Sequence, residues 1–302
     1  MRENLVPPKI NRDTNRGAVR LTLYAFLLVA TLLILATPAS GQWDVPQTAE
    51  PDRHMHLAAR ELTIPTPIPT PAELPQQAQV PILMYHYVSE LPPDADSIRR
   101  DLTVLPENFA AQLDYLAAAG YHTITLSDMY HHFAQGYPLP EKPIVLTFDD
   151  GYRDAYTVVF PMLLERGMTG TFFVLATPTH YESPDYITWD HMREMSRAGM
   201  DIQAHGRDHV DLRNRSNDFL VYQILGIQEA ILINVGHLPR FFCYPSGQYD
   251  QDVIAVLKSA GYWGAVTTAH GADHTLAGLF EMPRLRIHGY DTLESFAARL
   301  GD

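Results

Sequence analysis

The chain has 302 residues, of which 46% are hydrophobic, 10% aromatic and 19% charged. This composition supports at least one large core, and it excludes a chain disordered throughout, a collagen-like repeat and a small disulfide-stapled protein. Cys243 is the single cysteine, so no intramolecular disulfide can form. The formal net charge of −13 argues against nucleic acid as a partner.

Residues 1–41 predict a signal peptide or an N-terminal membrane anchor. A basic stretch over residues 1–20 precedes an uncharged apolar run, Leu21–Thr37. Such a run is either the core of a signal peptide or a minimal membrane span. Small residues at Ala39-Ser40-Gly41 suit cleavage, whereas the length of the run suits an uncleaved anchor, and both alternatives stay open. Because the basic side stays in the cytoplasm, we expect the rest of the chain outside the membrane, secreted or anchored by this segment alone.

Residues 42–79 predict a proline-rich linker, with seven prolines at 46, 51, 65, 67, 69, 71 and 75. Proline fixes φ and removes an amide donor, so we expect this segment to stay out of sheets and helices. An extended stalk of this kind would hold a domain away from a membrane.

Residues 80–302 alternate short apolar runs with helical patterns. The apolar runs predict strands, and the segments between most of them predict helices. The expected strands are 80–85, 121–126, 143–148, 170–175, 200–204, 240–244, 264–268 and 284–287, and the expected helices are 106–119, 156–166, 188–197, 218–234 and 252–260. Such alternation predicts an α/β fold, a distorted or incomplete (β/α) barrel of about seven strands. The chemistry of such barrels lies at the carboxyl ends of the strands.

Two adjacent carboxylates, Asp149 and Asp150, follow the expected strand 143–148. Neighbouring carboxylates repel each other unless a cation or base shares the site. Because they are sequential, they point in different directions, so one can bind a metal while the other accepts a proton. An Asp-Asp-Gly surface turn is the structural alternative.

His205 and His209 follow the expected strand 200–204 at a spacing that suits two ligands of one zinc ion. His270 and His274 repeat that spacing. We favour the first pair, because His205 directly follows a buried strand whereas His270 lies in a glycine-containing loop.

The strand 240–244 runs into a turn formed by Tyr244, Pro245, Ser246 and Gly247. A turn of this composition can leave backbone N–H groups facing a reacting oxyanion. An ordinary strand-ending turn is equally consistent with these residues alone.

Together and in this order, these clusters resemble the polysaccharide deacetylases of the NodB-homology type, carbohydrate esterase family 4. The resemblance covers about residues 80–290. It rests on VPILMYHYV at 80–88, LTFDDGYRDAY at 146–156, AGMDIQAHGRDHVDL at 198–212, RFFCYPSGQY at 240–249, GYWGAVTT at 261–268 and MPRLRIHG at 282–289.

The resemblance implies a role for each matching residue. Asp149 matches the catalytic base. The matching metal ligands are Asp150, His205 and His209, and the ion is usually zinc. Ser246 matches the residue whose backbone N–H helps to hold the oxyanion, and His288 matches the late histidine that protonates the leaving amine.

One departure from the family concerns the partner of the base. Many members have an arginine where this chain has Cys243. We hypothesise that Arg284 or Arg286 supplies the missing charge to Asp149. Cys243, flanked by Phe242 and Tyr244, is expected to be a buried thiol rather than a nucleophile.

The resemblance therefore implies a metal-dependent deacetylase acting on an N-acetylated polysaccharide outside the membrane. An O-acetyl esterase would use the same residues on an ester substrate. A glycan-binding domain without turnover is the non-enzymatic alternative.

Overall fold

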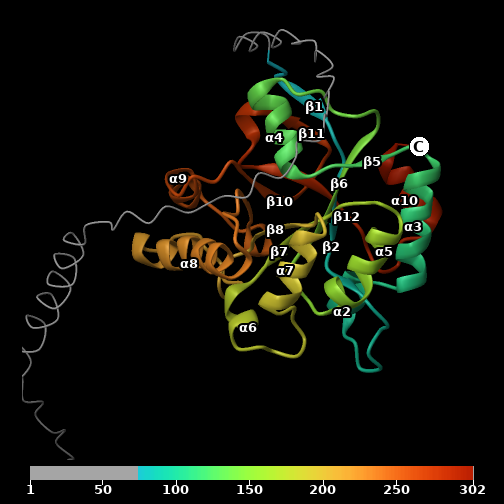
Figure 1. The fold of residues 1–302 in the computed structure, drawn as a ribbon, viewed down its shortest axis with the longest axis horizontal. Coiled ribbons are helices and arrows are strands. Elements are labelled where there is room, and N and C mark those ends of the chain that lie inside the picture. The colour runs from blue at the N-terminus through green and yellow to red at the C-terminus, as the bar shows by residue number, and fades with distance from the viewer. Residues whose placement is uncertain (1–73, 302) are drawn as a thin grey trace, which may run out of the picture. The chain divides into compact units, whose positions relative to one another are not determined.

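The computed structural model describes residues 74–301, and the segments expected to form the signal or anchor and most of the linker lie outside this part of the chain. Seven parallel strands close into a barrel in the order β2-β12-β10-β9-β8-β7-β6, and β6 pairs back to β2 (Figure 1). The barrel strands are β2 (Ile82–Tyr85), β6 (Pro143–Phe148), β7 (Thr171–Val174), β8 (Asp201–Ala204), β9 (Phe241–Cys243), β10 (Gly264–His270) and β12 (Met282–Arg286). The expected barrel of about seven strands is confirmed.

Helices surround the barrel strands (Figure 1). They are α2 (Ser97–Leu102), α3 (Pro106–Ala118), α4 (Leu126–Gln135), α5 (Phe160–Glu165), α6 (Ala176–His180), α7 (Trp189–Arg197), α8 (Asn217–Val235), α9 (Gln251–Ser259) and α10 (Leu293–Leu300). A π-helical segment, Ala155–Val159, precedes α5. Several helices begin at side-chain caps, as Thr188 and Ser216 show for α7 and α8.

The short strands lie outside the barrel. They are β1 (Gln77–Gln79), β3 (Tyr87–Val88), β4 (Thr103–Val104), β5 (His122–Thr123) and β11 (Asp273–Thr275). The expectation of a six-residue strand at 121–126 is therefore wrong in length, because α4 begins at Leu126 behind the capping residue Thr125.

The linker expectation is wrong at its C-terminal end. Residues Gln77–Gln79 pair antiparallel with Asp273–Thr275, and the amide of Val80 donates to the carbonyl of Ala272. The last proline of the linker is Pro75, so the amide donors that a sheet needs are present just beyond it.

The two sides of β2, β6 and β7 pack in different cores. Ile82, Val145 and Phe173 belong to one buried cluster, together with residues of α4, whereas their neighbours Leu83 and Phe172 pack with the surrounding helices. This alternation follows from the two-residue period of a strand. The same alternation continues past the ends of the strands, and it determines which polar side chains there point into the barrel.

Among the described residues, α8 is the one helix with the length and apolar composition of a membrane span. Its residues Leu220, Ile224, Ile227 and Ile231 are fully buried in the core around the barrel. We therefore assign α8 as a core helix of the barrel layer.

Candidate active site

A cavity of about 600 Å³ opens where the barrel strands end, and its lining includes Asp149, Asp150, His205 and His209. These residues come from the ends of two barrel strands, β6 and β8. The geometry therefore brings the two expected polar clusters together at the carboxyl end of the barrel, where the sequence placed them.

Asp150, His205 and His209 converge on one point. The Asp150 Oδ1 atom lies 3.2 Å from His205 Nε2 and 3.3 Å from His209 Nε2. Asp150 Oδ1 is also shielded from solvent, without a hydrogen-bond partner among the described residues. One carboxylate oxygen and two imidazole nitrogens at these separations fit a single divalent cation.

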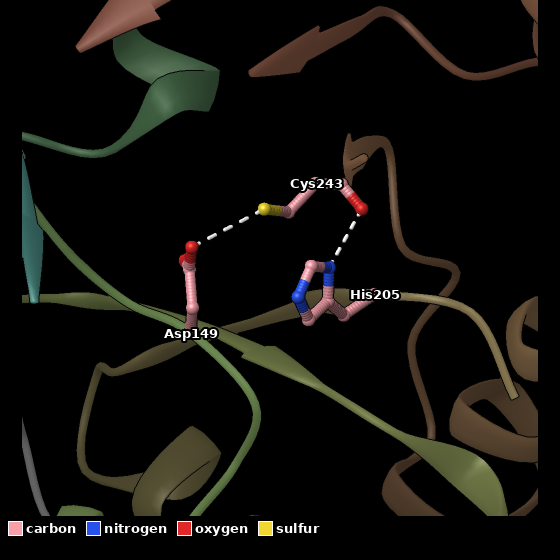
Figure 2. A group of neighbouring side chains, drawn as sticks. All are labelled: Asp149, His205 and Cys243. Carbon is pink, nitrogen blue, oxygen red and sulfur yellow. Dashed lines mark hydrogen bonds between the residues drawn. The ribbon is translucent and has the colours of Figure 1, made fainter. Parts of the chain in front are cut away.

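The surrounding backbone fixes the orientation of these ligands. His205 Nδ1 lies 2.7 Å from the carbonyl oxygen of Cys243, and its other ring nitrogen points away from that carbonyl (Figure 2). Donation from Nδ1 to a carbonyl leaves Nε2 as the nitrogen that can bind a metal. Asp150 and His209 both adopt positive φ, at 71° and 52°, a strained conformation that is typical of functional sites.

Protons and a cation compete for this cluster. Burial lowers the pKa of His205, but the neighbouring Cys243 and Asp150 outweigh burial and raise this pKa well above its usual value. Burial and the neighbouring His205 lower the pKa of His209. Because a histidine must give up a proton to bind a metal, we expect metal binding at this site to weaken as the pH falls.

Asp149 is held by Arg284 from β12. The guanidinium nitrogens Nη1 and Nη2 donate to Asp149 Oδ1 and Oδ2 over 2.8 and 2.7 Å, and both side chains are buried. Burial raises the pKa of Asp149, but the charge and hydrogen bonds of Arg284 outweigh burial, so the pKa lies well below its ordinary value. Of the two arginines considered from the sequence, the structure places Arg284 against Asp149.

A second group of potential ligands consists of Asp149, His205 and Cys243. Here the Cys243 thiol lies 3.4 Å from Asp149 Oδ2 (Figure 2) and 3.3 Å from Arg284 Nη2. A cation in this position would meet the guanidinium charge, and burial raises the pKa of the Cys243 thiol. We therefore favour Asp150, His205 and His209 as the metal ligands. The expected buried thiol is confirmed, since Cys243 is 1% exposed.

The turn after β9 leaves one amide for an oxyanion. The Gly247 amide donates to the Tyr244 carbonyl and the Gln248 amide to the Pro245 carbonyl, while proline has no N–H. The remaining N–H of the turn is that of Ser246, which lines the cavity at φ 53°. The Tyr244 hydroxyl donates instead to the Phe280 carbonyl, so Tyr244 contributes to the cavity wall.

His288 lies beside the cavity rather than in its lining. Its Nδ1 is 2.7 Å from Asp101 Oδ1, and Asp101 is the member of this pair that faces the cavity.

His86 also lines the cavity, although the sequence patterns did not identify it. Its Nε2 lies 4.0 Å from Asp149 Oδ2. Burial lowers the pKa of His86, and the two neighbouring aspartates oppose this shift.

The two-residue period of the strands could have identified His86. Ile82, Met84 and His86 share one side of β2 and its extension, in the same way that Thr147 and Asp149 share one side of β6.

The second histidine pair, His270 and His274, does not line the cavity that contains Asp150. His274 is buried with Nε2 2.9 Å from the Val80 carbonyl, and neither His270 nor His274 belongs to a potential ligand group among the described residues.

Comparison with known proteins agrees with this geometry. Residues 136–265 match the family model described as polysaccharide deacetylase. The chain is 29% identical over 211 residues to "Putative polysaccharide deacetylase YxkH" of Bacillus subtilis (strain 168), a match that spans 70% of this chain and 72% of that protein. It is 24% identical over 248 residues to the poly-beta-1,6-N-acetyl-D-glucosamine N-deacetylase of Escherichia coli (strain K12), over 68% of this chain and 37% of that protein.

A solved structure shares both the fold and part of the sequence. It is the Streptococcus pyogenes deacetylase PplD in complex with acetate, with a TM-score of 0.69 and 27% sequence identity. The match covers 74% of this chain and 98% of PplD. With the closed seven-stranded barrel and the polar residues at its strand ends, the chain is similar to the polysaccharide deacetylase family, and residues 136–265 match its family model.

Proposed function

We propose that this protein is a metal-dependent hydrolase that removes N-acetyl groups from an N-acetylglucosamine-containing polysaccharide and releases acetate. The observation that carries the proposal is the convergence of Asp150, His205 and His209 beside Asp149 in one cavity. Three ligands next to a separate, ionised carboxylate are the arrangement that metal-assisted hydrolysis requires.

Each residue has a distinct role in this proposal. Asp150, His205 and His209 hold the cation, which we propose to be zinc. Bound there, a divalent ion would polarise the acetyl carbonyl and lower the pKa of a water molecule. Asp149 accepts the proton of the attacking water, because Arg284 keeps this carboxylate ionised and fixed in orientation. The Ser246 amide donates to the oxygen on which negative charge develops.

The leaving nitrogen must gain a proton when the amide C–N bond breaks. We propose His86 as the donor, because it lines the cavity and lies near the carboxylate that has just accepted a proton. His288, the donor implied by the family resemblance, instead contacts Asp101. In this scheme His288 orients Asp101 at the cavity wall.

The substrate class follows from the similarity to the Escherichia coli deacetylase, whose name specifies poly-beta-1,6-N-acetyl-D-glucosamine. We propose a related acetylated glycan, without assigning its linkage. The apolar run Leu21–Thr37 supports an extracytoplasmic location, secreted or anchored through that segment.

The proposal is tested by acetate release from a panel of acetylated glycans, with and without chelator and added zinc. We expect release from amide-linked N-acetyl groups, loss with chelator and recovery with zinc. Faster release from O-acetylated xylan would support the esterase alternative. Absence of release from every glycan with zinc present would support a glycan-binding domain without turnover and overturn the proposal.

A further inference from the structure

A second pocket of about 400 Å³ lies next to the catalytic cavity, and the two share Tyr152 as a lining residue. We call it the side pocket and define it by Tyr87, Arg99, Tyr152, Asp154, Asp185 and Tyr186. None of these residues has a part in the proposed hydrolysis.

Aromatic rings form one wall of the side pocket. The Tyr87 and Tyr152 rings stack with centroids 3.7 Å apart, and the Tyr186 ring lies 5.3 Å from that of Tyr152. The Arg99 guanidinium covers the Tyr87 ring at 3.1 Å from its centroid. Aromatic rings with planar charged groups beside them provide an apolar surface and directed hydrogen bonds together.

The charges of the side pocket balance, and some of its hydrogen-bonding capacity is unused. Arg99 and Arg153 are matched in number by Asp154 and Asp185. Arg99 Nε and Asp154 Oδ1 are shielded from solvent and have no hydrogen-bond partner among the described residues. Such atoms are costly to leave unpaired, and a hydroxyl group can both donate and accept. A neutral, polyhydroxylated ligand fits this wall better than an ion.

The pocket is held in shape by backbone contacts between two loops. Tyr152 and Tyr186 form an antiparallel bridge, and the Arg153 amide donates to the Asp185 carbonyl over 2.8 Å. On the other side, the Val88 amide donates to Asp154 Oδ2 over 2.9 Å. A site preformed in this way loses little freedom when a ligand binds.

We propose that the side pocket is a sugar-binding subsite, which holds a neutral N-acetylated residue of the glycan chain while the catalytic cavity holds the residue that is deacetylated. The inference rests on the proposed function, because only a polymeric substrate continues from one pocket past Tyr152 into the other. It predicts that the protein prefers oligomers to short glycans.

The test compares kcat/KM on N-acetylglucosamine oligomers of five and two sugars, in both β-1,6 and β-1,4 linkage, using the full chain with zinc. The ratio of the two values is the readout, because a change at the catalytic cavity alters both substrates equally. We expect Tyr186→Ala to lower this ratio about tenfold, the loss typical of removing one aromatic contact. Tyr186→Phe keeps the ring and should largely retain the ratio, and Tyr137→Ala, at an exposed tyrosine outside both pockets, should leave it unchanged.

Binding of the five-sugar oligomers by calorimetry separates this inference from the proposed function. If the protein binds them without releasing acetate and Tyr186→Ala weakens binding about tenfold, the subsite stands and the hydrolase proposal fails. Equal ratios in the unaltered protein and Tyr186→Ala would overturn the subsite, as would equal affinities of the two proteins if acetate is not released.

Discussion

Asp149 and the arginine that holds it lie 135 residues apart in the sequence, but their strands β6 and β12 both pair with β2 in the barrel. The family position for such an arginine is occupied by Cys243, and the guanidinium of Arg284 reaches the same carboxylate from β12. If one of the two residues were replaced, the other would be an unpaired buried charge and would lower the free energy of unfolding. The two residues therefore stabilise the fold only as a pair. The ionisation of the Asp149 carboxylate also depends on Arg284.

Arg284→Met is expected to shift the pH dependence of hydrolysis. Without the guanidinium, burial raises the pKa of Asp149, so the carboxylate is protonated and activity is lost at a higher pH than in the unaltered protein. We expect the acid limb of the kcat/KM profile to move up by about one pH unit or more. The free energy of unfolding should also fall by about 3 kcal/mol.

Arg286→Met is the matched control, because Arg286 lines the cavity without a hydrogen bond to Asp149. Its acid limb should stay in place, as read from kcat/KM between pH 4 and pH 9. An acid limb that is the same in all three proteins would show that Arg284 does not set the ionisation of the base.

His86 and His288 are distinguished by their replacement with glutamine. If His86 protonates the leaving amine, His86→Gln should lower kcat by about 100-fold or more on amide substrates. His288→Gln should cost less, because His288 acts through Asp101. Steady-state acetate release measures both, and a larger loss in His288→Gln would restore the assignment implied by the family resemblance.

At the scale of secondary-structure elements, the two-residue period of the strands determines which polar side chains lie in the site. Cys243 and Arg284 lie on the interior side of β9 and β12, and Asp149 continues the interior side of β6, which is why these residues of three strands far apart in the sequence meet. The turns that follow the strands then set the exact directions of the ligands. Three of the described non-glycine residues with positive φ are Asp150, His209 and Ser246, all at the site.

Much of this could be predicted from the sequence, because buried strands and strand-end polar clusters are local patterns. The strands over 143–148 and 200–204, and the polar residues that follow them, required only such patterns. The pairing of Asp149 with Arg284 rather than Arg286 could not be read locally, because it depends on which side of β12 faces the barrel interior. The contact of His288 with Asp101 depends on how α2 packs.

Gly247→Ala tests the turn that presents the Ser246 amide. Gly247 has φ 68°, and a Cβ there would collide with the Thr268 Oγ1 atom, so the turn must shift. We expect a loss of about 2 kcal/mol in the free energy of unfolding and a fall in kcat of about tenfold or more.

Gly120→Ala is the control for the backbone cost alone, since Gly120 has φ 80° with nothing within 4 Å of the added atom. It should lose about 1 kcal/mol of stability and keep full activity. Denaturant unfolding and acetate release on both variants provide the comparison. Full activity in Gly247→Ala would remove the turn from the proposed mechanism.

At the scale of the whole molecule, the barrel domain begins before the boundary expected at residue 80. β1 pairs with β11, and His274 contacts the Val80 carbonyl across the same region. The seven prolines between residues 46 and 75 led to the expectation that all of residues 42–79 form a linker. Residues Gln76–Val80 contain no proline, so they can supply the amide donors of a short strand.

A fragment of residues 74–302 should therefore be more stable than one of residues 80–302. Losing the β1 pairing removes a few backbone hydrogen bonds, at a cost of about 1–3 kcal/mol. Both fragments should be soluble and release acetate, because the lining of the cavity at the strand ends, within residues 74–301, begins at His86. Thermal unfolding compares them, and equal stability would place the boundary at residue 80.

The proposed hydrolysis requires one cation held by Asp150, His205 and His209 beside Asp149, a carboxylate that does not bind it. The most direct test measures bound zinc and acetate release in the same preparations of the unaltered protein, Asp149→Asn and His205→Ala. We predict about one zinc per chain in the unaltered protein and in Asp149→Asn, with turnover only in the former, and loss of both zinc and turnover in His205→Ala. Full zinc content and full activity in both variants would contradict the proposed roles of Asp149 and His205.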